Sequence, residues 1–375
     1  MNAPARIAAV FAGRQPDRVP ICEQAFASSV ASQMFGRPMH TGSTELHYQE
    51  ACAWDAGEQA HAAFVEQVYA DTLELHRRLE LDILFLPWRY ATRPTRRLDE
   101  HRFLYGDPDG ADWAVYLFNP EARTYGLERA ANPDPSFEQV CARIRAELEQ
   151  PLPACVDVDP LLLRAQREES GSFVVAGGAG MGIPMQRGWL EATLLDPGLL
   201  AAFVERMTDG VLLHIEAQRA AGLRLINGGG DFAHNGGPIY SPTFFHEVMA
   251  PRWKRIFDRC RQLDAHYIFR SDGNLWTVAN DIFAWGRPAA YYECDYDAGM
   301  RFGDLRRRYP ELVLMGNVSC DLLRSGTPAE VAARTRECVA AAAPRVIAAS
   351  ANSILHGTPP ENVLALYEAA KAYRL

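Results

Sequence analysis

The sequence lacks any apolar run long enough to cross a membrane. A spanning helix requires a hydrophobic stretch of about 18 residues or more, and every apolar run in this chain is interrupted before that length. Residues 1–20 also lack the continuous apolar segment and small-residue cleavage pattern of a secretory signal peptide. These absences predict a cytoplasmic protein without a membrane partner.

Paired-cysteine and several linear catalytic motifs are missing as well. The eight cysteines are scattered and none forms a CxxC pair, which predicts reduced thiols in a long chain without a secretion signal. The absence of HExxH and GxSxG excludes a zincin-type metalloprotease and an α/β-hydrolase. No GxGxxG-type loop is followed by the acidic residue that a dinucleotide-binding sheet requires.

A strongly basic segment is also absent. The formal net charge is -9, and acidic and basic residues are mixed along the chain. Without a basic stripe, a nucleic-acid partner is disfavoured.

Short apolar segments alternate with amphipathic helical segments, and this is the main organising pattern. Continuous apolar strands separated by helices are typical of a parallel sheet. Eight such strands predict one α/β domain over residues 1–375, a (β/α)8 barrel, with a doubly wound sheet as the alternative. The predicted strands are 19–23, 81–86, 172–176, 223–227, 265–269, 289–293, 312–315 and 345–349. The helices predicted between the later strands include 196–220, 242–263, 303–308 and 328–343.

Residues 100–128 depart from this rhythm. A DPDG sequence stands there between two runs typical of β-strands, which indicates a hairpin. We expect this hairpin to be an excursion from the barrel, followed by a polar helix at 136–148.

In a (β/α)8 barrel the functional side chains lie on the loops that follow the strands. After the strand at 223–227, three glycines precede Asp231 and His234, which suits the floor of a pocket. Asp231 could accept a proton, position a substrate or ligate a metal; it could also cap a turn.

Arg270 and Asp272 directly follow the strand at 265–269. Side chains two residues apart on an extended segment point the same way. Such a pair could bind a carboxylate and carry a proton, or the two charges could neutralise each other as a structural ion pair.

Polar residues near the ends of the other strands are expected to converge on the same cavity, and this convergence is the strongest signal of a site. The predicted catalytic residues are Asp231, Arg270 and Asp272. The predicted substrate-binding residues are Arg187, Asn227, His234, Asn274, Glu293, Asn317 and Asn352. A metal site from Asp231, His234, Asp272 and Cys294 was considered, but no spacing signature joins them, so no metal is predicted.

Four segments carry a resemblance to a known family. They are residues 6–20 (RIAAVFAG, then PDRVP), 230–254, where Gly230-Asp231 precedes a Ser241-Pro242 helix start, 316–331 and 358–368. In this order they resemble uroporphyrinogen decarboxylase and the related corrinoid-dependent methyltransferases. The resemblance implies a (β/α)8 barrel with a deep cleft at the carboxyl ends of the strands, and a homodimer is plausible on the same basis.

The resemblance also implies two activities that the sequence separates. True decarboxylases carry an arginine-rich segment after the first strand, whereas residues 23–28 here are EQAFAS. Thiol-activating methyltransferases hold zinc with a His-x-Cys pair and a later cysteine. This chain has Arg270-Ser271-Asp272 at the pair and Asn352 or Ser353 at the cysteine, so no zinc is expected.

The function expected from these observations is methyl transfer between a small methoxy or N-methyl compound and a corrinoid (cobalamin) on a partner protein. Asp231 or Asp272 would be the general acid, and Arg270 would anchor a carboxylate or stabilise a developing anion. One alternative is a cofactor-free decarboxylase or lyase of a carboxylated small molecule. Another is a non-catalytic barrel that binds a corrinoid or another ligand.

Overall fold

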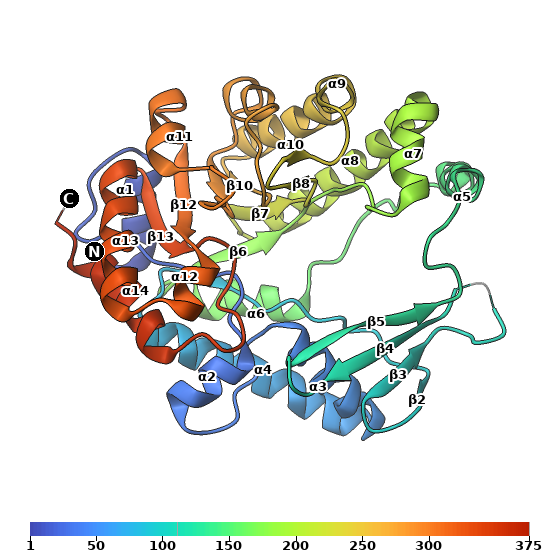
Figure 1. Cartoon of the computed structure of the whole chain (residues 1–375), viewed down its shortest axis with the longest axis horizontal. Helices are drawn as coiled ribbons and strands as arrows, with labels where there is room; N and C mark the ends of the chain where they lie inside the picture. Colours follow the sequence, from blue (N-terminus) through green and yellow to red (C-terminus); the bar gives the residue numbers. More distant parts are fainter. Residues whose placement is uncertain (111, 375) are drawn as a thin grey trace.

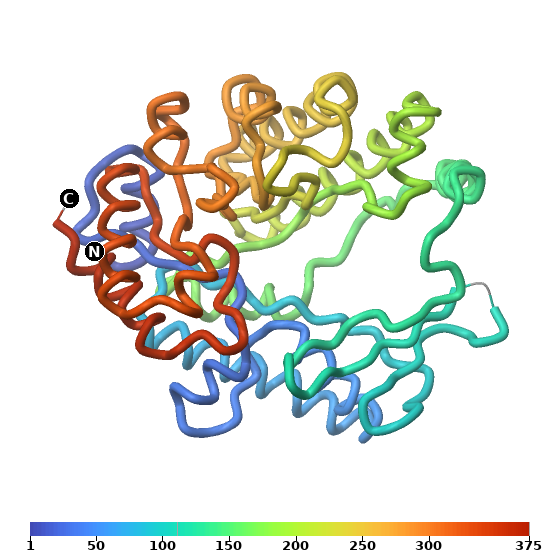
Figure 2. Tube along the Cα trace, in the orientation of Figure 1, coloured from blue at the N-terminus to red at the C-terminus, as the bar shows by residue number. Residues whose placement is uncertain are grey.

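Seven parallel strands form the central sheet of the computed structural model, which describes residues 1–110 and 112–374 (Figure 1). The trace in Figure 2 shows the sheet curling, with helices along its outer side. In spatial order the strands are β1 (Ile83–Phe85), β6 (Val174–Gly178), β7 (Leu225–Gly229), β10 (His266–Arg270), β11 (Ala290–Tyr292), β12 (Val313–Val318) and β13 (Val346–Ser350).

Side chains alternate between the two faces of this sheet, and each face builds its own core. In β12, Val313 and Met315 belong to an inner cluster with Ile83 of β1, whereas Leu314 belongs to the larger outer cluster. This alternation follows from the two-residue repeat of a strand. Both faces are therefore apolar, which is why the strands are continuous hydrophobic runs.

The eighth predicted strand, 19–23, forms a single bridge in place of a ladder. Ala348 N donates to Pro20 O (2.9 Å), Cys22 N donates to Ala348 O (3.1 Å), and Asp82 N donates to Ile21 O (2.8 Å). The segment thus lies between β13 and the residue that precedes β1. Pro20 has no N–H to give, so a regular ladder cannot form. The prediction of eight full strands is corrected to seven strands and this bridging segment.

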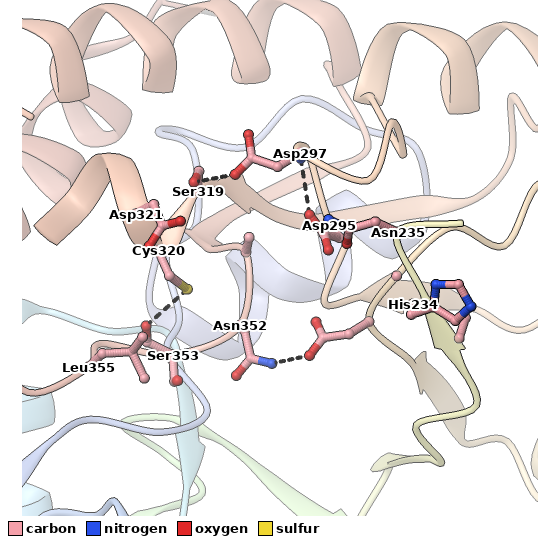
Figure 3. A pocket seen from close by; sticks show the side chains of 14 residues that line it. His234, Asn235, Asp295, Asp297, Ser319, Cys320, Asp321, Asn352, Ser353 and Leu355 are labelled. Carbon is pink, nitrogen blue, oxygen red and sulfur yellow. Dashed lines mark hydrogen bonds between the residues drawn. The ribbon is translucent and has the colours of Figure 1, made fainter. Parts of the chain in front are cut away.

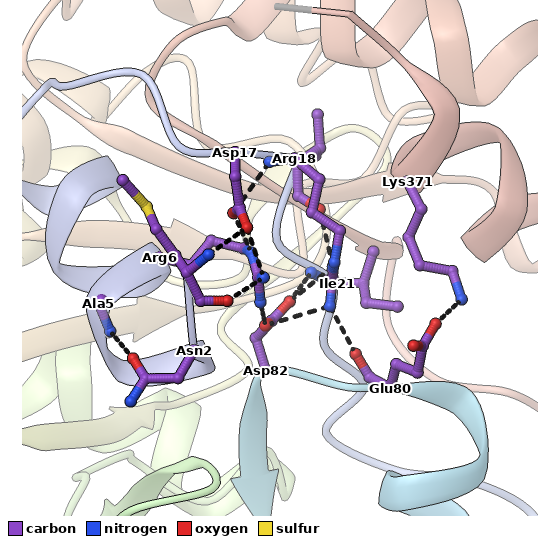
Figure 4. A network of polar contacts seen from close by, with 11 residues as sticks. Asn2, Ala5, Arg6, Asp17, Arg18, Ile21, Glu80, Asp82 and Lys371 are labelled. Atoms are coloured by element: carbon purple, nitrogen blue, oxygen red, sulfur yellow. Dashed lines mark hydrogen bonds and ion pairs between the residues drawn. The ribbon is translucent and has the colours of Figure 1, made fainter.

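A buried carboxylate secures that segment (Figure 4). Asp82, only 1% exposed, accepts hydrogen bonds from Arg6, from Arg18 Nη1 (3.0 Å) and from Ile21 N (2.9 Å). Arg6 lies on α1 (Ala3–Phe11), and its Nε also bonds Asp17 Oδ1 (2.7 Å). The network therefore fastens the first helix and the bridging segment to the start of β1.

Helices α6, α10, α13 and α14 pack against the outer face of the sheet. The helices of the chain are α2 (Ser28–Phe35), α3 (Thr44–Asp55), α4 (Glu58–Leu79), α5 (Phe137–Glu149), α6 (Pro160–Glu169), α7 (Arg187–Leu195), α8 (Pro197–Ala220), α10 (Ala250–Gln262), α11 (Phe302–Arg308), α12 (Cys320–Ser325), α13 (Pro328–Ala342) and α14 (Pro360–Ala372). Within the described part of the chain, none has the length and hydrophobicity that a membrane crossing requires.

The helix predicted at 242–263 is interrupted. It consists of α9 (Pro242–Phe244), a π-helical segment (Phe245–Met249) and then α10. Pro251 cannot donate the backbone hydrogen bond that a regular helix requires at its position, and the wider turn precedes it. A second π-helical segment covers Asn280–Gly286.

The predicted hairpin excursion is present and is larger than expected. A four-stranded antiparallel sheet comprises β2 (Arg96–Arg97), β3 (Arg102–Tyr105), β4 (Ala114–Asn119) and β5 (Thr124–Ala130). Helix α3 packs against it, and Tyr48 stacks on Phe118 with ring centroids 4.0 Å apart. The excursion has its own small core and lies beside the curled sheet (Figure 1).

Candidate active site

Polar side chains gather where the carboxyl ends of the parallel strands meet. Asp231 follows β7, Arg270 ends β10, and Glu293 follows β11. Together with Asp272 and Asn352 they line two adjoining cavities. A small β-ribbon, β8 (Ala233–His234) with β9 (Gly237–Pro238), borders the same rim.

The first cavity, called here the central cavity, has a volume of about 350 Å³. Its polar lining includes Gln24, Asn227, Asp231, Arg270 and Glu293. Its apolar and aromatic lining includes His47 of α3 together with Phe85, Leu86, Pro87 and Trp88, which form the end of β1 and the loop after it. A cavity of this size suits a small molecule.

The second cavity, called here the acidic cavity, has a volume of about 420 Å³ (Figure 3). Asp272, Asp295, Asp297 and Asp321 line it, together with His234, Ser319 and Cys320. Asn352 belongs to the lining of both cavities. Its Nδ2 donates to Asp272 Oδ2 at 2.6 Å, and this bond stands at the boundary between them.

Glu293 and Arg270 form an ion pair in the central cavity. Arg270 Nη1 lies 2.8 Å from Glu293 Oε1, and Gln24 Nε2 donates to the same oxygen. Glu293 is 2% exposed and has φ of +61°, a backbone conformation that non-glycine residues rarely adopt. Strain of this kind is characteristic of functional sites.

Three buried polar atoms of this cavity have no hydrogen-bond partner among the residues that the structure describes. They are Glu293 Oε2, Arg270 Nε and Asn227 Oδ1. Buried polar atoms are normally paired because an unmade hydrogen bond destabilises the fold. Since all three belong to residues that line one cavity, a ligand is their natural partner.

Asp272 is poised to exchange a proton near neutral pH. Burial, the largest cause, and the negative charges of Glu293 and Asp231 together raise the pKa of its carboxyl group to about 7, although the hydrogen bond from Asn352 acts in the opposite direction. Burial also raises the pKa of Glu293, although the Arg270 charge and the Gln24 hydrogen bond counteract it. A carboxyl group with a pKa near the working pH can act as a general acid or base.

Asp231, Asp272 and Glu293 each place one carboxyl oxygen within 4.8 Å of such an oxygen of the other two. The structure thus brings together the three residues predicted to be catalytic, Asp231, Arg270 and Asp272, with Glu293 as a fourth member. We call Asp231, Asp272 and Glu293 the carboxyl cluster. Their catalytic roles remain predictions.

These residues do not fit a thiol-activating zinc centre. Arg270 places a guanidinium beside the cluster, and it already occupies one oxygen of Glu293. The nearest cysteine in sequence, Cys294, is fully buried and directs its Sγ to Tyr291 O. The resemblance implies a His-x-Cys pair and a later cysteine for such a centre, whereas the cluster here consists of carboxyl groups and His234 is exposed on the other cavity.

Three predicted substrate-binding residues lie outside both cavities, and a role for them in binding stays a prediction. Arg187 begins α7, is exposed and pairs with Asp134 (3.6 Å). Asn274 accepts a hydrogen bond from Trp276 N in a local turn (3.0 Å). Asn317 is fully buried, and its amide donates to Cys294 O (2.6 Å) and Met300 O (3.2 Å). These bonds stabilise the loop before α11, and Asn317 is not among the residues that line either cavity. Asn227, His234, Glu293 and Asn352 do line the cavities.

Several lining residues are missing from the predicted set, among them Gln24, Trp88 and His47 of the central cavity. Gln24 follows the bridging segment, and Trp88 closely follows β1, so the rule of examining the residues after each strand could have identified both. His47 lies on α3, outside the sheet. Its position depends on tertiary packing, for which the sequence offers no local signal.

The fold and the site define an α/β protein whose ligand cavity lies at the carboxyl ends of a curled parallel sheet. Residues 172–373 match the uroporphyrinogen decarboxylase (URO-D) family, and the chain belongs to that family. The resemblance seen in the sequence is thereby confirmed.

Of two similar solved structures, the first supports the fold. A methyltransferase from Methanosarcina mazei matches with a TM-score of 0.65 and 17% identity, covering 99% of this chain and 98% of the other. A Listeria monocytogenes protein named as a vitamin-B12-independent methionine synthase matches with a TM-score of 0.39 and 13% identity, covering 59% and 72%. No curated protein matches the sequence.

Proposed function

We propose that this protein is a methyltransferase that moves a methyl group between a small methoxy or N-methyl compound and a corrinoid carried by a partner protein. The observation that carries the proposal is Asp272, which lines the acidic cavity beside Asp231 and Glu293 of the central cavity and whose carboxyl group has a pKa raised to about 7. The full-length likeness in fold to a Methanosarcina methyltransferase supports it. The corrinoid would supply the nucleophile that accepts the methyl group.

The chain's own residues would bind the substrate and manage the proton. Protonated Asp272 would donate to the oxygen or nitrogen that loses its methyl group, since such a leaving group departs more easily when it is protonated. Asn352 would hold the Asp272 carboxyl group in place through its 2.6 Å bond. The ion pair with Arg270 would hold the Glu293 carboxylate in place in the lining of the central cavity.

The test mixes the purified chain with cob(I)alamin and a panel of methoxy and methylamine donors, and it follows the cobalamin absorption spectrum. We expect a spectral change that requires both donor and protein. With methoxy donors, Asp272→Asn should slow the reaction by about 10²–10⁴-fold, the usual contribution of a general acid. Asp157→Asn, at an exposed aspartate that lines neither cavity, is the control and should retain activity. If no donor changes the spectrum, the proposal is wrong.

A second candidate is a cofactor-free decarboxylase or lyase. The unpartnered Nε of Arg270 favours it, because a substrate carboxylate could fill that position. The family to which the chain belongs is named for a decarboxylase. Release of carbon dioxide from a carboxylic acid in the absence of cobalamin would support this candidate over methyl transfer.

A further inference from the structure

The central cavity and the carboxyl cluster, whose Asp272 lines the adjoining acidic cavity, carry negative charge. Arg270 is the guanidinium in the lining of the central cavity, and it is already bound to Glu293 at 2.8 Å. His47 adds no positive charge near neutral pH, because burial lowers the pKa of its imidazole. Even with Asp272 protonated, two carboxylates face one cation. A ligand that matches this cavity therefore carries positive charge.

A carboxyl cluster alone does not define a ligand site, but two further features point to a ligand here. Glu293 is 98% removed from solvent, and its Oε2 has no partner within the described chain. An unpaired buried carboxylate oxygen is destabilising unless a cation or a donor reaches it. The other feature is the aromatic part of the lining of the central cavity.

An aromatic wall lines the same cavity, defined by His47, Phe85 and Trp88. Tyr90 supports it from behind. Its ring stacks on His47 at 3.9 Å between centroids and meets Trp88 edge to face at 5.4 Å. Trp88 is nevertheless 73% exposed, an unusual position for so large an apolar side chain. Such a ring offers its surface to a ligand.

Carboxylates together with aromatic faces are the recognition chemistry of methylated ammonium groups. A quaternary ammonium has no N–H to donate, so it is held by charge and by the electron-rich faces of aromatic rings. A neutral methoxy compound would leave the negative charge of the cavity without a partner. We propose that the central cavity binds a small methylated organic cation, a quaternary ammonium compound, between the carboxyl cluster and the aromatic wall.

This inference rests on the proposed function for its chemical meaning, because it names the methyl donor. When the donor is quaternary, the C–N bond breaks and its electron pair stays on nitrogen. The methyl group passes to the reduced corrinoid, which supplies both electrons of the new bond. The leaving group is a neutral tertiary amine, so departure requires no proton. Asp231 and Asp272 would then serve mainly as negative charges that hold the donor.

The experiment is calorimetric titration of the whole chain with tetramethylammonium and choline. The control ligand is 3,3-dimethylbutan-1-ol, which has the shape of choline without its charge. We expect choline to bind at least about tenfold more tightly than the alcohol, in keeping with the free energy of a desolvated cation–π contact. Equal affinity for the two, or binding of neither cation, would overturn the inference.

Variants localise the binding. Asp231→Asn and Trp88→Leu should each weaken choline binding by about three- to tenfold, whereas Asp157→Asn, at an exposed aspartate that lines neither cavity, should not change it. Circular dichroism checks that each variant is folded. Equal effects of Asp231→Asn and Asp157→Asn would show only a general field effect and would overturn the assignment. So would tight binding of Mg²⁺, Mn²⁺ or Zn²⁺ alone that excludes choline, because the cluster would then be a metal site.

Titration requires no corrinoid, so its outcome is separable from that of the proposed function. Choline binding without methyl transfer from any donor would refute the function and leave the ligand class standing. Methyl transfer from methoxy donors alone, without cation binding, would support the proposed function and refute the quaternary ammonium ligand.

Discussion

Arg270 and Glu293 come from adjacent strand ends, and their side chains meet at 2.8 Å with very different exposure. Glu293 is 2% exposed, whereas the Arg270 side chain is 39% exposed. Arg270 therefore keeps contact with solvent while it neutralises a carboxylate that has almost none. The arginine expected to anchor a substrate carboxylate is thus engaged within the protein, and this shifts the charge balance of the cavity towards cation binding.

The first prediction concerns removal of that arginine. Arg270→Met leaves the Glu293 carboxylate buried without its counter-ion. Breaking a fully buried pair destabilises a protein by about 3–5 kcal/mol. We expect about 1–3 kcal/mol here, since Arg270 is partly exposed and Gln24 still donates to Glu293. Urea denaturation measures the free energy of unfolding.

The pH dependence and a double variant test the cause of that loss. In Arg270→Met the pKa of Glu293 rises further, so the destabilisation should be smaller at pH 5 than at pH 8. The second substitution in Arg270→Met/Glu293→Gln removes the charge and should restore most of the stability at pH 8. A loss that is independent of pH and persists in the double variant would point to lost packing instead.

The second prediction concerns Asp272, whose pKa is raised to about 7. Besides burial, which is the largest cause, its pKa is raised by the negative charges of Glu293, Asp231 and Asp295. The hydrogen bond from Asn352 lowers it. A cation prefers the ionised form, so choline affinity should increase roughly tenfold between pH 6 and pH 8, the ratio expected for a single group of this pKa. Asp272→Asn should abolish that dependence, and calorimetric titration at each pH measures it.

The pH dependence that Asp272 gives to the free energy of unfolding should have the opposite sign to that of choline affinity. A carboxyl group whose pKa is raised on folding stabilises the fold below its ordinary pKa, and this contribution is lost as the pH rises through about 7. Relative to the unaltered chain, Asp272→Asn should therefore be more stable at pH 8 than at pH 5. Thermal denaturation at the two pH values tests the sign.

Much of the fold could be predicted because its signals are local. Apolar strands separated by amphipathic helices show at once in the sequence, and the seven strands of the central sheet and the excursion lie within a few residues of their predicted positions. The closing segment could not be predicted correctly. Whether residues 19–23 form a ladder depends on Pro20 and on hydrogen bonds to residues that are more than 300 positions away.

The site was predictable where a parallel sheet dictates it. Asp231, Arg270 and Asp272 gather because parallel strands end at one edge. Asn317 shows the limit of that rule. The predicted strand ends at residue 315, but β12 continues to Val318, so Asn317 lies inside the strand and is buried. An error of a few residues in a strand end thus exchanges a cavity position for a core position.

The third prediction concerns Glu23, a carboxyl group that ties the bridging segment to the sheet and to α14. It accepts hydrogen bonds from Ser350 Oγ (2.7 Å), Tyr292 Oη (3.1 Å) and Tyr367 Oη (3.1 Å). Burial raises its pKa to about 7. Its contribution to stability is therefore greatest at low pH and is lost as the pH rises through that value.

Tyr367→Phe removes one donor from this carboxyl group. A hydrogen bond to a charged group contributes about 1.5–3 kcal/mol, and one to a neutral group about 0.5–1.5 kcal/mol. Urea denaturation should therefore show a loss near 1 kcal/mol at pH 5 and about 2 kcal/mol at pH 8. Tyr373→Phe, on the same C-terminal segment but without a bond to Glu23, is the control. Equal losses at both pH values would mean that Glu23 keeps one protonation state throughout.

The fourth prediction concerns Gly229, the last residue of β7, which pairs with Arg270 of β10. A Cβ at this position would lie 1.8 Å from Arg270 O, a backbone atom that cannot move without displacing the strand. Gly229→Ala should therefore destabilise the protein by about 1–3 kcal/mol or more, as overpacked sites do. It should also weaken ligand binding, because it displaces the residue that neutralises Glu293.

Gly210→Ala in helix α8 is the matched control, since its Cβ would meet nothing within 4 Å in the described part of the chain. Alanine there should stabilise the helix by up to about 1 kcal/mol. Urea denaturation of both variants, with choline titration of each, compares the same substitution at the two positions. Similar stability and binding in the two variants would show that the close approach of β7 and β10 is relaxed in solution.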